Sequence, residues 1–213
     1  MKPKMDYSLY LVTDSALMAA KCIEECVEQA ILGGCTVVQL REKTASSRDF
    51  YETAMAVRRI TRKHGVPLIV NDRADIAEAV GAEGLHIGQD DLPYEAARRL
   101  LGPDKIIGIS ASNLAEAEEA VRLGADYLGV GAMFSTDTKT DASLTSMAEL
   151  RQIRALTALP IVVIGGINMQ TIPLFVGTGI DGVAVVSAIV AQADIAGAAR
   201  EMKALFQRTG VQR

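Results

Sequence analysis

A chain of 213 residues, 49% of them hydrophobic, can bury the core of one large domain or of two small ones. The formal net charge of -4 argues against a general surface for nucleic acid or anionic membranes, because both need an excess of Lys and Arg. Aromatic residues make up 4% of the chain and Trp is absent, which argues against stacking platforms for single-stranded nucleic acid. Any anion that the protein binds must therefore be held by a local group of residues.

The sequence carries no sign of membrane insertion or export. No segment has the length and apolar composition of a transmembrane helix. The first residues, MKPKMDYSLYLVTD, include two lysines but neither a long apolar run nor a small-residue cleavage site. We therefore expect a cytoplasmic protein with no membrane or nucleic-acid partner. The oligomeric state, a homo-oligomer included, is left open.

Eight short apolar runs recur along the chain and predict β-strands. They occupy residues 8–13, 36–42, 67–72, 84–88, 105–110, 127–131, 160–166 and 182–187. Most are apolar at consecutive positions, which is typical of strands covered on both faces in a parallel sheet. Stretches with helical spacing lie between them. In residues 49–65, for example, Phe50, Ala54 and Val57 share one face.

Glycines mark the ends of several predicted helices. In residues 113–126, Asn113 fits an N-cap and Gly124 fits the left-handed stop of a helix. The same kind of stop recurs in LGGCT, VGAEG and TGIDG, at intervals of about two β/α units. The chain thus contains a repeated pattern of strand, helix and glycine stop.

Eight β/α units in one chain predict an α/β fold, a single (β/α)8 TIM barrel spanning residues 1–213. A flavodoxin-like sheet would use only five or six strands, and no Pro/Gly/Ser-rich linker or charge block divides the chain. All the strands of such a barrel point the same way. Their carboxyl ends meet at one mouth, where the active sites of these barrels form.

Polar residues follow almost every predicted strand, at the expected mouth of the barrel. They are Gln39, Arg41, Glu42 and Lys43 after the second run, Asn71 and Asp72 after the third, Gln89, Asp90 and Asp91 after the fourth, and Ser110 at the end of the fifth. The later runs continue into FSTDTKTD, IGGIN and VSAI. Asn and Asp favour turns in any case. Polar endings on so many strands nevertheless exceed what turns require and predict a ligand site.

Two groups of these residues have charges suited to a diphosphate. Arg41, Lys43 and Lys139 are cations in an acidic chain, and both side-chain types suit phosphate. The alternative is salt bridging to Glu42 or a solvated rim. Asp72 and Asp91 follow neighbouring strands and could together hold Mg²⁺, which takes one or two carboxylates besides water and phosphate oxygens. Each carboxylate alone could instead cap a helix.

The last two strands end in a pattern typical of a barrel phosphate site. IGGIN, residues 164–168, provides glycines that let backbone N–H groups approach an anion, and VVSAI, residues 185–189, follows at the next strand. A tight strand-to-helix turn would explain the glycine pair alone. Together with the cations, the pattern predicts two anion sites, one for a diphosphate and one for a monophosphate.

The motifs themselves resemble those of the thiamine phosphate synthase family. VVQLREK, IVND, GLHIGQDD, GISAS, TDTKTD, IGGIN and VVSAI follow that family's order and spacing over nearly the whole chain. The resemblance implies a TIM-barrel transferase that is assisted by Mg²⁺. Its substrates would be 4-amino-2-methyl-5-hydroxymethylpyrimidine diphosphate and 4-methyl-5-(2-phosphoethyl)thiazole, and its products thiamine phosphate and pyrophosphate. The diphosphate would leave first, in a dissociative step that creates a pyrimidine cation.

The resemblance also implies roles for individual residues. Contacts to the pyrimidine diphosphate would come from Gln39, Arg41, Lys43, Asn71 and Lys139, with Ser110 near the reacting pyrimidine and Asp72 and Asp91 on Mg²⁺. The thiazole phosphate would be received by Thr136, Thr138, Gly166, Val186 and Ser187. Lys139, Arg41 and Ser110 would be the catalytic residues. No side-chain nucleophile is needed, so we expect His64 to end a helix and His86 to be a hydrogen-bonded barrel residue.

One segment departs from the family pattern, and two other functions stay open. Family members usually carry GPxxPT where this chain has GAMFST, with Ala132 and Ser135, so we expect a looser loop there. A thiazole tautomerase shares the barrel and much of the phosphate site, but has a histidine where this chain has Ser110 or its neighbours. A non-catalytic barrel that binds a phosphate ligand is the third alternative. Turnover of the pyrimidine diphosphate separates all three.

Overall fold

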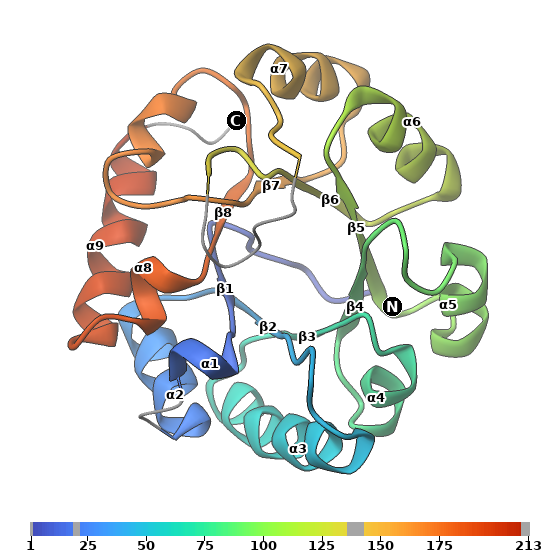
Figure 1. Cartoon of the computed structure of the whole chain (residues 1–213), viewed down its shortest axis with the longest axis vertical. Helices are drawn as coiled ribbons and strands as arrows, with labels where there is room; N and C mark the ends of the chain where they lie inside the picture. Colours follow the sequence, from blue (N-terminus) through green and yellow to red (C-terminus); the bar gives the residue numbers. More distant parts are fainter. Residues whose placement is uncertain (1, 19–21, 136–142, 210–213) are drawn as a thin grey trace.

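Eight parallel strands close into a barrel in the computed structural model, which describes residues 2–18, 22–135 and 143–209 (Figure 1). The strand order follows the sequence, and pairing of the first strand with the last closes the barrel. The strands are β1 (Leu9–Val12), β2 (Val37–Leu40), β3 (Leu68–Asn71), β4 (Gly84–Ile87), β5 (Ile106–Ala111), β6 (Tyr127–Val130), β7 (Ile161–Val163) and β8 (Gly182–Val185). Each lies within one of the eight predicted runs, except that β5 extends one residue beyond its run, to Ala111. The predicted (β/α)8 TIM barrel is therefore confirmed.

Helices surround this barrel, as Figure 1 shows in a view along its axis. They are α1 (Ser15–Met18), α2 (Ile23–Gly33), α3 (Ser47–His64), α4 (Ala74–Ala79), α5 (Tyr94–Leu101), α6 (Leu114–Leu123), α7 (Met147–Leu156), the 3-10 helix η1 (Ile172–Phe175), α8 (Ser187–Val190) and α9 (Ile195–Arg208). The predicted cap of α6 is confirmed, because the Asn113 side chain accepts the N–H of Glu116 and Gly124 has a φ of 89°. Within the ranges that the structure covers, we find no helix long and apolar enough to cross a membrane.

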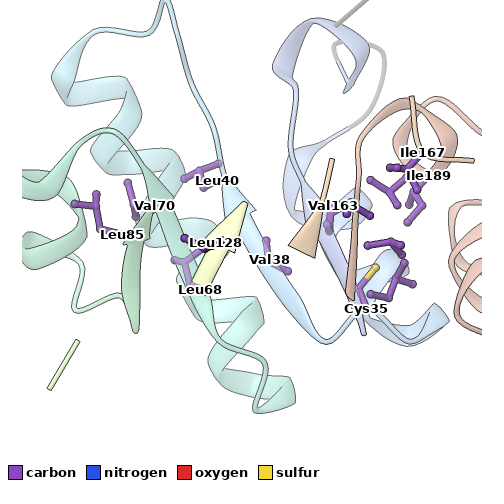
Figure 2. Packing of buried hydrophobic residues seen from close by; sticks show 14 of the residues in the cluster. Cys35, Val38, Leu40, Leu68, Val70, Leu85, Leu128, Val163, Ile167 and Ile189 are labelled. Atoms are coloured by element: carbon purple, nitrogen blue, oxygen red, sulfur yellow. The ribbon is translucent and has the colours of Figure 1, made fainter. Parts of the chain in front are cut away.

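The apolar runs bury both faces of every strand. Val38 and Leu40 face outward and pack in the layer between the strands and the helices (Figure 2). Val37 belongs to a second cluster inside the barrel, and Gln39 faces the same interior from higher up the strand. Because successive side chains point to opposite faces, a strand covered on both sides needs apolar residues at consecutive positions. This explains why the predicted strands lack an alternating pattern.

A repeated polar contact joins pairs of strands at the amino-terminal end of the barrel. An acidic residue stands directly before β4, β6 and β8, and its carboxylate accepts a backbone N–H at the start of the preceding strand at 2.8 to 2.9 Å. An arginine from the helix that precedes the bonded strand (α3, α5 or α7) pairs with each carboxylate. The three pairs are Arg58 with Glu83, Arg98 with Asp126, and Arg154 with Asp181.

The same position before β2 holds Thr36, whose hydroxyl oxygen accepts the N–H of Leu9 at 3.1 Å. These four residues belong to the four glycine-containing segments that recur in the sequence. The repeat therefore provides a helix stop followed by an acceptor for the neighbouring strand.

We expect Asp126→Ala to lower the free energy of unfolding by about 2–4 kcal/mol, because Arg98 and the N–H of Ile107 both lose a charged partner. Glu119→Ala, which removes the exposed partner of Arg122 on α6, should leave the unfolding midpoint almost unchanged. Urea unfolding followed by far-UV circular dichroism measures both. Equal midpoints for the two variants would contradict a stabilising role for the repeat.

Candidate active site

A cavity of about 1110 Å³ opens at the carboxyl ends of the strands, where the sequence predicts the site. All the predicted site residues that the structure describes line it: Gln39, Arg41, Lys43, Asn71, Asp72, Asp91, Ser110, Gly166, Val186 and Ser187. They come from the ends of six different strands but meet because parallel strands end at one edge. Thr136, Thr138 and Lys139 lie outside the described residues.

Two carboxyl groups and one cation meet on the β3 and β4 side of the cavity. Asp72 follows β3, and the ammonium of Lys43 lies 2.5 Å from its Oδ2. Partial burial and a hydrogen bond with the Asp91 carboxyl raise the pKa of Asp72, and Lys43 opposes this rise. Asp91 itself accepts the N–H of Gly88 at 2.7 Å. Two carboxylates held this close gain from a second cation between them.

Asp72 has an unusual backbone conformation that fixes this geometry. Its φ is 63°, in the left-handed region that Asp tolerates better than most residues with a side chain. Its N–H donates to the carbonyl oxygen of His86 at 2.9 Å, which ties the turn to β4. The strained turn brings the carboxylate from the end of one strand toward Asp91 after the next.

The carboxylate pair suits Mg²⁺ better than a metal held by protein ligands alone. Within residues 2–18, 22–135 and 143–209, no three His, Cys, Asp or Glu side chains are grouped so as to hold a metal ion. Mg²⁺ usually keeps several waters and binds through one or two carboxylates and the phosphates of the substrate. Asp72 and Asp91 provide that number of carboxylates at the edge of the cavity.

The cations of this side contact aspartates, not Glu42. Arg41 lies 4.0 Å from the carboxylate of Asp14, and its backbone N–H donates to the hydroxyl of Thr13. Glu42 instead accepts a hydrogen bond from Ser15 at 2.9 Å. The sequence also allowed salt bridges from Arg41 and Lys43 to Glu42. In the structure, both cations form their ion pairs with other residues.

Five hydrogen-bonded side chains form the floor of the cavity. Gln39 Nε2 donates to the Tyr10 hydroxyl at 2.9 Å, and the Tyr10 and Tyr127 hydroxyls are 2.8 Å apart. His86 contacts the Tyr127 hydroxyl through Nδ1 at 2.8 Å and Ser110 Oγ through Nε2 at 2.9 Å. Burial lowers the pKa of His86 to about 4, so the ring is neutral at pH 7. The prediction that His86 is a hydrogen-bonded barrel residue is confirmed.

Tyr10 and Tyr127 also belong to the site, although no sequence pattern predicted them there. Both lie in apolar runs, where a tyrosine resembles any other core residue. The sequence nevertheless holds one signal, a glycine inside a predicted strand. In the structure this residue, Gly108, pairs in register with both His86 and Tyr127. A Cβ on Gly108 would lie 2.1 Å from Cζ of Tyr127. A glycine inside a strand often marks such a close approach.

The ends of β7 and β8 form the other side of the cavity. Gly166 has a φ of 66°, and a Cβ there would lie 2.6 Å from Cβ of Phe134, so only glycine fits. Val186 and Ser187 line the cavity next to it, with Ser187 as the first residue of α8. This side presents backbone and a hydroxyl rather than charged side chains. It contrasts with the charged side around Asp72.

The segment that lacks the family's prolines is tied to its neighbours where it is described. Ala132 donates its N–H to Ser143 and accepts the N–H of Thr145, and Met133 and Phe134 donate to carbonyls after β7. Ala132 and Ser135 both line the cavity. Residues 132–134 are thus hydrogen-bonded to neighbouring segments, and the looser loop expected from the missing prolines stays a prediction.

Comparisons with known proteins show the family to which the chain belongs. The family model described as thiamine monophosphate synthase matches residues 9–189. A thiamine-phosphate synthase from Clostridium beijerinckii is 59% identical over 206 residues, 97% of this chain and 99% of that protein, and one from Chloroflexus aurantiacus is 52% identical over 96% and 95%. The structure of a thiamine phosphate pyrophosphorylase from Pyrococcus furiosus superimposes with a TM-score of 0.88 at 38% identity, covering 96% of this chain and 98% of that one. The chain therefore belongs to the thiamine monophosphate synthase family.

Proposed function

We propose that the chain condenses 4-amino-2-methyl-5-hydroxymethylpyrimidine diphosphate with 4-methyl-5-(2-phosphoethyl)thiazole, forming thiamine phosphate and releasing pyrophosphate. One observation carries this proposal: a single cavity combines a cationic and carboxylate side with a glycine-built side, each suited to a different anion. The names of relatives that match almost the full chain support the same reaction.

The diphosphate binds on the side of Lys43 and Arg41. Asp72 and Asp91 hold Mg²⁺ there, which supplies positive charge to the leaving pyrophosphate when it is bound. The ammonium of Lys43 and the guanidinium of Arg41 bind the remaining phosphate oxygens. Lys139, assigned from the sequence alone, adds a third cation. These groups stabilise the charge that develops as the C–O bond breaks.

The pyrimidine ring lies on the floor between Gln39, Asn71 and Ser110. Loss of pyrophosphate leaves a cation at the exocyclic methylene, stabilised by the electron-rich aminopyrimidine. The thiazole nitrogen attacks that carbon, so no side chain has to act as the nucleophile. His86 is neutral and engaged at both ring nitrogens, which agrees with this scheme.

The thiazole phosphate binds at the ends of β7 and β8. Gly166, Val186 and Ser187 offer N–H groups and a hydroxyl to its oxygens. Thr136 and Thr138 are assigned to the same phosphate from the sequence alone. The two anions thus bind on different sides of the cavity, with the reacting carbon and nitrogen between them.

Ser187→Asp is expected to raise the KM for the thiazole phosphate at least about tenfold and to change the KM for the pyrimidine diphosphate little. The reason is that like-charge repulsion is local and is screened beyond about 10 Å. Ser187→Ala is the matched control and should have a small effect on both values. Steady-state rates with each substrate varied in turn measure this. An equal rise of both KM values in Ser187→Asp would contradict two separate anion sites.

The experiment that tests the proposed function follows the fate of both substrates. Purified protein is incubated with the pyrimidine diphosphate, the thiazole phosphate and Mg²⁺, and the products are separated by chromatography. We expect thiamine phosphate. A proton shift in the thiazole without release of pyrophosphate would identify a thiazole tautomerase instead. Binding of both ligands without turnover would identify a non-catalytic barrel.

A further inference from the structure

The hydrogen-bonded floor of the cavity connects two residues that both face the substrate. It runs from Gln39 through Tyr10, Tyr127 and His86 to Ser110, with four successive contacts of 2.8 to 2.9 Å. The two tyrosines are 1% and 0% exposed and His86 is 8% exposed, so water does not compete for these contacts. A buried chain of this kind has a definite direction of donation.

The orientation of the Gln39 amide sets that direction. The Gln39 amide nitrogen donates to the Tyr10 oxygen, so the single hydroxyl hydrogen of Tyr10 goes to Tyr127. The hydrogen of Tyr127 then goes to Nδ1 of His86. A neutral imidazole that accepts at Nδ1 carries its hydrogen on Nε2, which donates to Ser110 Oγ. The Ser110 hydroxyl therefore keeps its own hydrogen free for the cavity.

The two ends of the chain consequently present opposite groups to a ligand. Gln39 donates an N–H to Tyr10, so its carbonyl oxygen can act as an acceptor toward the cavity. The Ser110 hydroxyl is a donor. An aminopyrimidine carries the complementary pair, an exocyclic amino group that donates and an adjacent ring nitrogen that accepts. A 4-oxo analogue carries the reverse pair. The arrangement therefore favours the amino compound.

The barrel wall makes room for this chain at two glycines. A Cβ on Gly108 would collide with the Tyr127 ring, and a Cβ on Gly129 would lie 2.8 Å from Cε1 of His86. Gly129 pairs in register with Ser110, so the His86 ring fits over the strand next to that serine. The backbone of Ser110 is fixed separately, because Gln89 Nε2 donates to its carbonyl oxygen at 2.7 Å.

We propose that Tyr127 and His86 are positioning residues that hold the Ser110 hydroxyl as a hydrogen-bond donor, and so select a 4-aminopyrimidine over a 4-oxopyrimidine. The inference rests on the proposed function, since it assumes that the pyrimidine lies on this floor. Neither residue has to touch the substrate. Their effect reaches it through Ser110.

Two tyrosine variants provide a matched test. Tyr127→Phe removes the hydroxyl that donates to His86. Either ring nitrogen of His86 can then carry the hydrogen, so Ser110 is no longer held as a donor. Tyr10→Phe also removes one buried hydroxyl, but Tyr127 keeps His86 as a partner for its hydroxyl hydrogen, so donation to Nδ1 and from Nε2 to Ser110 remains available. A merely structural role of Tyr127 would give Tyr127→Phe the same effect on binding with and without Ser110→Ala.

The measurement is the Kd of the pyrimidine diphosphate with Mg²⁺ and without the thiazole phosphate, by calorimetry. We expect Tyr127→Phe to weaken binding about tenfold in the otherwise wild-type chain and to have almost no effect in the Ser110→Ala background. Tyr10→Phe should have the same effect in both backgrounds. The preference for the amino over the 4-oxo compound should fall about tenfold in Tyr127→Phe alone.

His86 variants keep the test decisive if Tyr127→Phe does not fold. His86→Gln offers an oxygen to Tyr127 and an N–H to Ser110, whereas His86→Met offers neither, so only the glutamine variant should retain most of the amino preference. Independent effects of Tyr127→Phe and Ser110→Ala, or equal preferences in the two His86 variants, would overturn the inference. Wild-type protein that fails to bind the pyrimidine diphosphate would instead overturn the proposed function.

Discussion

Asp72→Asn should lower turnover on the order of 100-fold to 1000-fold at Mg²⁺ concentrations that saturate the wild type. The substitution removes one of two adjacent carboxylates and leaves Asp91 as the remaining charged ligand. Asparagine is the appropriate replacement because it keeps the shape of the side chain and tolerates the φ of 63° at this position. Initial rates as a function of Mg²⁺ concentration measure the loss.

Stability should change in a different direction from activity in this variant. Burial and the neighbouring Asp91 raise the pKa of Asp72, so the ionised side chain is less favourable in the folded state than in the unfolded state. Removing that charge should leave the unfolding midpoint at pH 7 unchanged or higher. Asp75→Asn is the control, since this exposed residue pairs with Arg73 outside the cavity and should keep full activity. Full activity of Asp72→Asn at the same Mg²⁺ concentration would rule out the metal assignment.

Lys43→Ala is expected to lower kcat about 30-fold to 1000-fold, corresponding to about 2–4 kcal/mol of transition-state stabilisation. The Lys43 ammonium lies 2.5 Å from the carboxylate of Asp72. Its interaction with the leaving pyrophosphate strengthens as the C–O bond breaks, so kcat should fall more than the KM for the diphosphate rises. Lys43→Arg should recover only part of the rate, because the guanidinium places its charge differently.

A distant lysine provides the control for Lys43. Lys63 pairs with Glu28 between α3 and α2, away from the cavity, and Lys63→Ala should keep the wild-type kcat and KM. Single-turnover release of pyrophosphate, measured by rapid quench, separates the bond-breaking step from product release. If Lys43→Ala raised KM and left this single-turnover rate unchanged, Lys43 would contribute to binding alone.

The fold and the charged side of the site could be predicted because local signals agree with the global arrangement. Each strand is apolar on both faces, and glycines such as Gly124 end the helices before the next strand. Once the strands are known to be parallel, residues after them must meet at one mouth. Asp72 and Asp91, 19 positions apart in the sequence, could therefore be assigned to one site without a structure.

The place of Tyr10 and Tyr127 in the floor of the site could not be predicted, for a physical reason. When both faces of a strand are apolar, the sequence does not tell which face points into the barrel. Tyr10 and Tyr127 are separated by most of the chain, and their contact depends on the register of five intervening strand pairs. The contacts of Arg98 with Asp126 were missed for a related reason, since they depend on how a helix lies against the next strand.

The most direct test of the central claim is the stoichiometry of the reaction. Purified wild-type protein is mixed with both substrates, with and without Mg²⁺, and thiamine phosphate and pyrophosphate are quantified in the same samples. We expect equal amounts of the two products, formed when both substrates and Mg²⁺ are present and reduced together in Asp72→Asn. Pyrophosphate release without thiamine phosphate, or no product from saturating substrates and Mg²⁺, would contradict it.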